Sequence, residues 1–323
     1  MGHYLVTGAV GFIGAYTSET LLQDGHTVIG IDNMNDAYDV RMKEYRLLRL
    51  QKIPGFTFHK IDISLKKEIE PLKKEKFDAI IHLAARAGVR ASVENPWLYY
   101  ETNVTGTLNL LELSRSAGIP KFLLASTSSI YGANPPYPTP ESASSSEPLQ
   151  PYAASKKAGE VLAHAYHSLH GLDVSIVRYF TVYGPAGRPD LAIFRFCQWI
   201  SEGQPVRVNG DGEVSRGFTY VDDIARGTIL ALKPLGYEII NLGGHEVITI
   251  NGLIKLLEEL IGKKADVQYG PPNLADMPSN WADVSKAERL LGWEPRVSLR
   301  EGVKKIVDWY AAERSWVSGI LTP

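Results

Sequence analysis

A tyrosine and a lysine four residues apart are the side chains of this sequence best suited to acid–base chemistry. Tyr152 and Lys156 begin a stretch with a helical pattern, so they share one helix face. A free tyrosine has a pKa of about 10, and a neighbouring ammonium favours its phenolate form. Tyr152 is therefore predicted to act as a general base. The alternative for such a pair is a partly exposed helix face without a chemical role.

A run of hydroxyl residues ends the apolar stretch over residues 121–126. Ser126, Thr127, Ser128 and Ser129 follow one another there. Ligands of parallel sheets bind beyond the carboxyl ends of the strands, so these hydroxyls are placed to hold a substrate alcohol and relay its proton. The alternative is a capped turn without a ligand.

Three glycines near the N-terminus predict a phosphate-binding turn. An apolar strand over residues 4–6 leads into Gly8, Gly11 and Gly14, and a helix then runs to about residue 23. The first two glycines allow the backbone to turn tightly beside a pyrophosphate, and the third allows close packing of the helix. The helix N-terminus offers free N–H groups to phosphate. Alone, such a turn also forms without a ligand.

Asp32 makes the dinucleotide interpretation more specific. It ends the next apolar strand, where its carboxylate is placed to accept hydrogen bonds from a ribose diol. A carboxylate repels a 2′-phosphate, and positions 33 and 34 hold no Lys or Arg. The sequence therefore predicts NAD in preference to NADP. The positive nicotinamide ring would add to the effect of Lys156 on Tyr152.

Strands alternate with helices through the first half, which is typical of a parallel sheet covered on both faces. Strands are expected over residues 4–6, 27–30, 56–61, 77–83, 121–126 and 174–179. Helices are expected over residues 12–23, 39–51, 96–117 and 152–170, and the second of these is basic and amphipathic. This order predicts an α/β fold in which residues 1–180 form a doubly wound (Rossmann) parallel sheet.

The rhythm changes after residue 180. Residues 206–208 and 214–220 have the pattern of a β-hairpin around a glycine-rich turn. Helices are expected over residues 191–202, 222–232, 250–261, 285–291 and 299–313, and a strand over residues 238–242. We expect residues 181–323 to form a smaller α/β substrate-binding domain, with the chain returning to the first domain around residues 217–243.

Composition narrows the possible classes of protein. The chain has 323 residues, is 44% hydrophobic and 22% charged, and carries a net charge of −2. It has no basic excess for nucleic acid or an anionic membrane surface, and no apolar run long enough to span a membrane. Cys197 is the only cysteine, which excludes an internal disulfide. The start lacks the pattern of a cleavable leader, so a soluble, cytoplasmic protein is expected.

A metal site has little support in the sequence. His164, His167 and His170 recur every third residue on one predicted helix. No carboxylate or cysteine accompanies them, so they are interpreted as surface histidines and no metal is predicted.

The motifs together resemble the extended short-chain dehydrogenases that act on nucleotide sugars. The resemblance covers nearly the whole chain and is carried by residues 7–14, 83–85, 103, 126–132, 152–156, 178–185, 216–223, 241–244 and 283–287. It implies that Thr127, Tyr152 and Lys156 are the catalytic group. It also implies a tightly held NAD and a UDP-sugar substrate.

The resemblance carries over specific binding residues. NAD contacts are implied at Gly8, Gly11, Phe12, Ile13, Gly14, Asp32, Asn33, Asp62, Ile63, Leu83, Ala84, Ala85, Asn103, Ser126, Tyr152, Lys156 and Tyr179. Substrate contacts are implied at Arg90, Thr127, Ser128, Ser129, Tyr152, Thr181, Arg188, Arg216 and Asp283, with Arg216 near the pyrophosphate.

Residues 181–190 and, in part, residues 87–92 favour a uronate substrate within this family. Residues 181–190 are similar to UDP-glucuronate 4-epimerases, which interconvert UDP-glucuronate and UDP-galacturonate, and Arg188 offers a planar fork for a carboxylate. Arg188 has two alternatives, a phosphate contact or a surface position. Ser128 and Ser129 stand where the family's 4,6-dehydratases carry an Asp-Glu pair.

Three other functions remain as alternatives. They are a UDP-glucose/UDP-galactose 4-epimerase, a UDP-glucuronate decarboxylase and an NAD-binding regulator without catalysis.

Family members pair two long helices across a two-fold axis. A homodimer is therefore expected through residues 96–117 and 152–170, with apolar contacts from Leu108, Leu111, Val161, Leu162 and Tyr166.

Overall fold

A parallel seven-stranded sheet forms the centre of the computed structural model, which describes residues 1–244, 246–272 and 279–322. Its strand order is β10-β6-β5-β4-β1-β2-β3. The strands are β1 His3–Thr7, β2 Thr27–Asp32, β3 Phe56–Lys60, β4 Ala79–His82, β5 Lys121–Thr127, β6 Asp173–Tyr179 and β10 Tyr237–Leu242. Every residue of β4 and β5 is buried, as in strands covered on both faces. The predicted doubly wound α/β fold is confirmed.

Two apolar cores lie on opposite faces of this sheet. Neighbouring residues of one strand enter different cores, with Val6 in one and Leu5 in the other, because side chains alternate along a strand. The first core contains residues of α1 Phe12–Gln23, α2 Arg41–Leu50 and α9 Val221–Leu230. The second contains residues of α6 Gly106–Ala117 and α7 Pro151–His170. In sheets of this kind ligands bind beyond the carboxyl ends of the strands.

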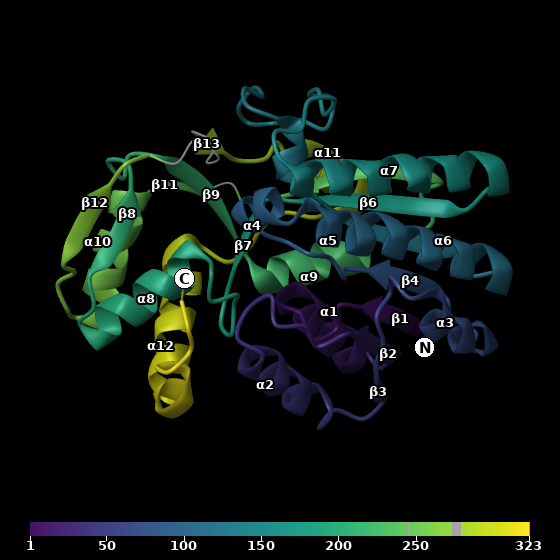
Figure 1. Cartoon of the computed structure of the whole chain (residues 1–323), viewed down its shortest axis with the longest axis horizontal. Helices are drawn as coiled ribbons and strands as arrows, with labels where there is room; N and C mark the ends of the chain where they lie inside the picture. Colours follow the sequence, from purple (N-terminus) through teal and green to yellow (C-terminus); the bar gives the residue numbers. More distant parts are fainter. Residues whose placement is uncertain (245, 273–278, 323) are drawn as a thin grey trace.

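The remaining strands form two small sheets in the second half. β7 Thr181–Tyr183, β9 Ser215–Tyr220, β11 Glu246–Thr249 and β13 Ser279–Asn280 make one, and β8 Val206–Asn209 and β12 Val267–Gly270 make the other. Figure 1 shows β8 and β12 grouped with the helices α8 Ala192–Glu202, α10 Ile250–Ile261 and α12 Leu299–Val317 at one end of the molecule. β10 pairs in parallel with β6 in the main sheet. The division into two domains at residue 180 stays a prediction.

The predicted hairpin over residues 206–220 is wrong. β8 pairs in parallel with β12, whereas β9 pairs with β7, β11 and β13. Gly210 and Gly212 have φ of 75° and 78°, so a turn does form, but it directs the two strands into different sheets. The prediction of a turn is therefore correct, but the prediction that the two flanking strands pair with each other is wrong.

The expected helix over residues 96–117 contains a wider turn. It consists of α5 Pro96–Tyr100, a π-helical turn η2 Glu101–Thr105 and α6 Gly106–Ala117. Such turns often occur at functional sites, and this one carries Asn103. The other helical segments are α3 Lys66–Ile69, η1 Glu70–Lys74, α4 Val89–Glu94, η3 Ser128–Tyr131 and α11 Ser285–Leu291.

The sequence predicts neither a membrane-spanning helix nor a metal site. Within the described ranges, no helix is long and apolar enough to cross a membrane. His164 and His167 pack their rings against Tyr237, and the His170 ring packs against Tyr166. No group of three His, Cys, Asp or Glu side chains suited to a metal ion occurs among the residues described.

Candidate active site

The glycine turn between β1 and α1 is built from backbone in contact with backbone. Gly8 has a φ of 66°, and Gly11 N donates to Gly8 O at 2.9 Å. A Cβ at Gly14 would lie 2.0 Å from Gly8 O, and a Cβ at Gly8 would lie 2.8 Å from Ala84 N. Side chains are therefore excluded where the loop after β4 meets the start of α1. Phe12 and Ile13 form the first turn of that helix.

This turn fits the phosphates of a dinucleotide. The N-terminus of α1 follows the closely packed glycine loop directly and has no side-chain cap, and the free N–H groups of a helix N-terminus suit an anion. Arg86, in the loop after β4, has a buried Nε without a hydrogen-bond partner within the described residues. An unpaired buried donor is costly, so a further acceptor is expected beside it.

Asp32 ends β2 with a buried carboxylate, as expected for a ribose contact. Its Oδ1 accepts from Met34 N at 2.8 Å and from Lys43 Nζ at 3.1 Å. Lys43 comes from α2, and the sequence analysis missed it because it considered only neighbours along the chain. A cation thus lies beside the carboxylate that is predicted to bind the ribose.

Asn33 and Asp62 lie together at the ends of adjacent strands. Asn33 Nδ2 donates to Asp62 Oδ2 at 2.8 Å, and Ser64 donates twice to Asp62 Oδ1. Burial acts to raise the pKa of Asp62, but these hydrogen bonds hold it below its usual range. Ile63 is buried against Gly106. The glycine turn and the ends of β2, β3 and β4 are called the cradle below. Its edge at Asp62 presents a fixed, ionised carboxylate.

A buried histidine links the end of β1 to the first turn of α6. His82 Nδ1 lies 2.8 Å from Thr7 Oγ1, and Nε2 lies 2.9 Å from Thr107 Oγ1. Thr7 Oγ1 also accepts from Ala84 N, between Leu83 and Ala85 in the cradle. Burial and the nearby Lys156 ammonium hold the pKa of His82 well below its usual value, so the ring is neutral.

Asn103 connects this cradle to the catalytic helix. Its side chain exchanges two hydrogen bonds with the backbone of Arg86, and Nδ2 donates to Ser155 Oγ at 2.9 Å. Ser155 Oγ in turn donates to Tyr152 O at 2.7 Å. Asn103 therefore positions the first turn of α7, where Tyr152 lies.

The predicted catalytic residues meet at the junction of β5 and α7. Burial raises the pKa of Tyr152, while a hydrogen bond with Thr127 and the Arg188 guanidinium oppose this without reversing it. Burial also lowers the pKa of Lys156 to about 8 against the effect of Glu160. The protein side chains alone do not produce the phenolate expected from the sequence. The positive charge of a bound nicotinamide would favour the phenolate further.

Glu160 organises polar groups behind the catalytic helix, and the sequence analysis did not identify it. Its carboxylate accepts from Ser126 Oγ at 2.6 Å and from two nitrogens of Arg178 at 2.9 and 2.7 Å. The proton of the Ser126 hydroxyl is therefore donated to Glu160, within the protein. Tyr179, another predicted cofactor contact, pairs its hydroxyl with Thr228 in the core.

The hydroxyl run after β5 is ordered by neighbouring groups. Thr127 Oγ1 accepts from Ser129 N and donates to Ser129 Oγ, each at 3.2 Å. Ser128 Oγ accepts from Asn280 Nδ2 of β13 at 3.0 Å. Asn280 was not identified from the sequence, and it connects the second half of the chain to this run.

Arg188 lies in the loop of residues 184–190, which is called the Arg188 loop below. Its Nε and Nη2 bind the Asp190 carboxylate, at 3.0 and 2.5 Å, and Nη2 also lies 3.4 Å from Ala87 O. Burial acts to lower the pKa of Arg188, but Asp190 raises it overall, so the group stays charged. One edge of the predicted fork is therefore occupied by Asp190.

A short chain of contacts connects Arg188 to the base. Tyr99 OH donates to Gly88 O at 2.9 Å, in the same loop whose Ala87 O lies near Arg188. The Tyr99 ring packs edge-on against the Tyr152 ring, with the centroids 6.2 Å apart. The Arg188 charge is also close enough to act on the pKa of Tyr152, the predicted base.

The other predicted substrate residues are spread more widely. Thr181 begins β7, and Arg90 is exposed on α4. Arg216 Nη1 donates to the neighbouring Ser215 O at 2.9 Å. The substrate roles of Thr181, Arg90 and Arg216 therefore stay predictions.

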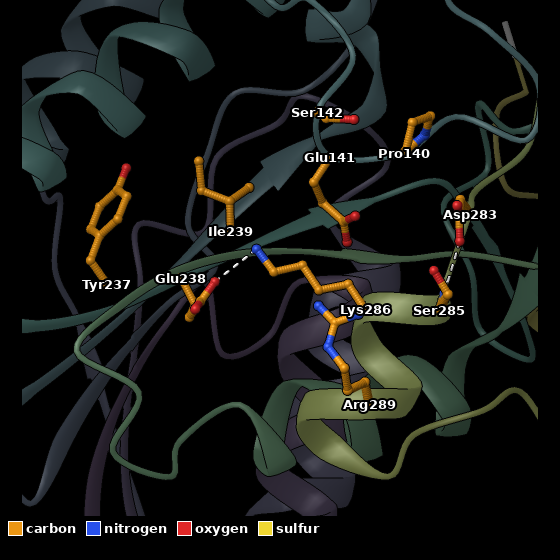
Figure 2. Close-up of a pocket in the computed structure, with 10 residues that line it drawn as sticks. All are labelled: Pro140, Glu141, Ser142, Tyr237, Glu238, Ile239, Asp283, Ser285, Lys286 and Arg289. Atoms are coloured by element: carbon orange, nitrogen blue, oxygen red, sulfur yellow. Dashed lines mark hydrogen bonds and ion pairs between the residues drawn. The ribbon is translucent and has the colours of Figure 1, made fainter.

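Asp283 lies in a separate pocket. Its carboxylate accepts from Ser285 N at 2.9 Å, at the start of α11. Figure 2 shows it in a pocket of about 520 Å³, opposite β10 and beside Lys286 and Glu141. None of the three predicted catalytic residues lines this pocket. The contacts seen for Asp283 are structural, and its role toward substrate stays a prediction.

Comparisons with known proteins agree with this arrangement. The NAD dependent epimerase/dehydratase family matches residues 4–243. A UDP-glucuronate 4-epimerase of Thermodesulfobacterium geofontis is 56% identical over 312 residues, covering 96% of each chain. UDP-glucuronic acid 4-epimerase from Bacillus cereus, in complex with UDP-glucuronic acid and NAD, is 36% identical with a TM-score of 0.86, covering 96% of this chain and 99% of that one.

A neutral-sugar enzyme has a similar structure. UDP-glucose 4-epimerase from Thermotoga maritima, with UDP-glucose, is 34% identical with a TM-score of 0.89. The match covers 97% of this chain and 99% of that one. The fold is therefore shared by enzymes for charged and uncharged sugars, and the substrate has to be argued from the site.

Proposed function

Because the chain belongs to the NAD-dependent epimerase/dehydratase family, we propose that it inverts C4 of UDP-glucuronate to give UDP-galacturonate. The observation that carries the uronate assignment is Arg188, a charged guanidinium close enough to oppose the burial that raises the pKa of Tyr152. A sugar whose C4 hydroxyl reaches Tyr152 would bring its C5 carboxylate to this side of the site.

Tyr152 and Thr127 act on the C4 hydroxyl. Tyr152 removes its proton, and the Thr127 hydroxyl, already hydrogen-bonded to the phenol, holds the sugar oxygen in line. When NAD is bound, the hydrogen at C4 has an acceptor that can later return it to the opposite face of the sugar. Lys156 keeps a positive charge next to the cofactor position below a pH of about 8.

Arg188 has a second task, which is to prevent loss of carbon dioxide. Oxidation at C4 of a uronate gives a β-keto acid, which decarboxylates readily when the C5–carboxylate bond aligns with the carbonyl π system. A guanidinium that fixes the carboxylate torsion holds that bond out of alignment while the ring rotates. Ser128 and Ser129 add neutral donors, and they cannot replace the acid–base pair that a 4,6-dehydratase needs.

Product analysis tests this proposal. Purified protein is incubated with UDP-glucuronate, and the anomeric signals are followed by proton NMR. New UDP-galacturonate signals without UDP-pentose are expected. A UDP-pentose product would instead identify a decarboxylase, and no conversion of any UDP-sugar would favour an NAD-binding regulator.

A homodimer through α5, α6 and α7 is part of this proposal. The outer faces of these helices expose large apolar side chains, namely Trp97, Leu108, Val161 and Leu169 at 81%, 38%, 59% and 76%. Leu111, which was expected in the interface, is instead fully buried in the second core. An apolar surface of this kind is typical of a protein–protein contact.

The dimer can be tested by light scattering at micromolar concentration. The wild type should have twice the mass of the chain, and Val161→Glu should shift it toward the monomer. A monomeric wild type would remove this part of the proposal. A cytoplasmic location is proposed as well, in keeping with the single cysteine, which is a buried free thiol.

A further inference from the structure

Arg46 is a buried arginine on α2 that the proposed reaction does not use. The residue is 1% exposed. Within the described residues, all of its hydrogen bonds go to backbone carbonyls and to one phenol. A guanidinium has five N–H donors in a rigid plane, so it can hold several backbone segments at once.

Two of these carbonyls belong to the Arg188 loop. Arg46 Nε and Nη2 donate to Ala186 O at 3.0 and 2.7 Å, and Nη2 also donates to Gly187 O at 3.2 Å. Ala186 has a φ of 50°, which is unfavourable for a residue with a Cβ. Such a conformation persists only where surrounding contacts hold it. Arg46 therefore fixes the backbone two residues before Arg188.

The third carbonyl belongs to the glycine turn. Arg46 Nη1 donates to Val10 O at 3.1 Å and to Tyr38 OH at 2.8 Å. Its guanidinium also lies 5.9 Å from the centroid of the Phe12 ring, at the start of α1. One side chain thus fastens the Arg188 loop to the cofactor turn.

The same loop has a weaker second anchor. Tyr16 OH, from α1, donates to Pro185 O at 3.0 Å. Both anchors come from elements of the cofactor half, and both hold backbone atoms. The position of Arg188 relative to a bound sugar is therefore set by side chains far from it in the sequence.

We propose that Arg46 is a positioning residue for uronate selectivity, which rests on the proposed function. It contacts neither the sugar nor Arg188. By holding Ala186 and Gly187 against the glycine turn, it fixes where the Arg188 guanidinium meets the sugar carboxylate. Loss of Arg46 should weaken recognition of the carboxylate and spare recognition of the UDP group.

Calorimetric titration tests this separation. UDP-glucuronate and UDP are titrated into NAD-loaded protein in a Tyr152→Phe background, which prevents turnover. Arg46→Met should lower the affinity for UDP-glucuronate about tenfold, the size of one weakened charge-assisted contact, and change the affinity for UDP by less than about twofold. Arg46→Lys should fall between, because one ammonium cannot replace the planar fork.

Two further variants keep the test decisive. Arg41→Met is the matched control on the same helix, since Arg41 binds Asp39 and Gly319 O, and both affinities should be unchanged. If Arg46→Met is insoluble, Tyr16→Phe removes the weaker anchor and should lower UDP-glucuronate affinity about threefold, with UDP affinity retained.

The outcomes separate this inference from the proposed function. An Arg46→Met variant that loses affinity for both ligands equally, or for neither, overturns the positioning role. A parent protein that binds UDP-glucuronate no better than UDP-glucose, titrated in the same way, contradicts the uronate assignment itself. In the intact Tyr152 background, Arg46→Met should also release UDP-pentose, detectable by mass spectrometry.

Discussion

The glycine turn and the Arg188 loop lie against each other but are built in different ways. In the turn, backbone meets backbone, and a Cβ at Gly14 would lie 2.0 Å from Gly8 O. In the loop, strained backbone is held by distant side chains, above all by Arg46 on Ala186 O. The first region therefore depends on local glycines, and the second on long-range contacts. Cofactor chemistry and substrate selection should accordingly be separable by mutation.

The largest effect is expected at the predicted base, which lies outside both regions at the start of α7. Tyr152→Phe removes the proton acceptor and keeps the ring, so turnover should fall by about 10²–10⁴-fold on every sugar that the protein converts. Binding of UDP-glucuronate should persist in calorimetry. Near-normal turnover in this variant would assign the base to another residue. A loss confined to uronates would show that chemistry and selection are not separable here.

A matched pair of glycine substitutions compares the two regions directly. Gly14→Ala places a methyl group against fixed backbone, so NAD binding should be lost, at a cost above the usual range of about 1–3 kcal/mol for overpacking. At Gly187 the nearest atom to a Cβ is Gly184 O at 3.0 Å, followed by the edge of the Phe12 ring at 3.7 Å. Gly187→Ala should retain NAD binding, measured by fluorescence titration. An equal loss of NAD affinity in the two variants would contradict the view that the glycine turn depends on backbone contacts and the Arg188 loop does not.

Substitution of Arg188 should act on one substrate class only. Arg188→Ala should cost about 1.5–3 kcal/mol in transition-state binding of UDP-glucuronate, because charge-assisted hydrogen bonds are lost. Any UDP-glucose turnover should change little. Arg188→Lys should recover part of the activity, since a point charge cannot reproduce the fork. An equal loss in kcat/KM on both sugars would give Arg188 a phosphate-binding or structural role.

These differences explain which parts of the site could be predicted from the sequence. The glycine turn, Asp32 and the Tyr152–Lys156 pair are local patterns, and the order of strands and helices predicted the doubly wound sheet. Arg46 could be seen only as part of a basic helix, because its main partner is 140 residues away. Asn280 was missed for the same reason, because its partner Ser128 is 152 residues away. Lys43 is only 11 residues from Asp32, but the contact depends on how α2 packs beside the end of β2. The hairpin failed because a turn pattern does not specify which strands will pair.

His82 offers a smaller effect on the cofactor side. Its pKa in the folded protein lies well below the ordinary 6.5, so the unfolded chain binds a proton that the native state does not. The free energy of unfolding should therefore fall as the pH drops below about 6.5, by up to about 1.4 kcal/mol per pH unit. Denaturant unfolding between pH 7.5 and 5.5 measures this slope.

A variant isolates the contribution of this histidine. His82→Asn should reduce the slope, and His59→Asn, at an exposed position of β3, is the matched control. A slope that is unchanged in His82→Asn would mean that other groups cause the acid sensitivity. The low pKa of His82 between Thr7 and Thr107 would then be contradicted.

The most direct test of the whole account is a competition between charged and neutral sugars. Wild-type protein is given equal concentrations of UDP-glucuronate and UDP-glucose in one tube, and both products are followed by NMR. UDP-galacturonate should form well before UDP-galactose, and this preference should be lost in Arg188→Ala. Faster formation of UDP-galactose by the wild type would contradict the assignment of the Arg188 loop to a uronate.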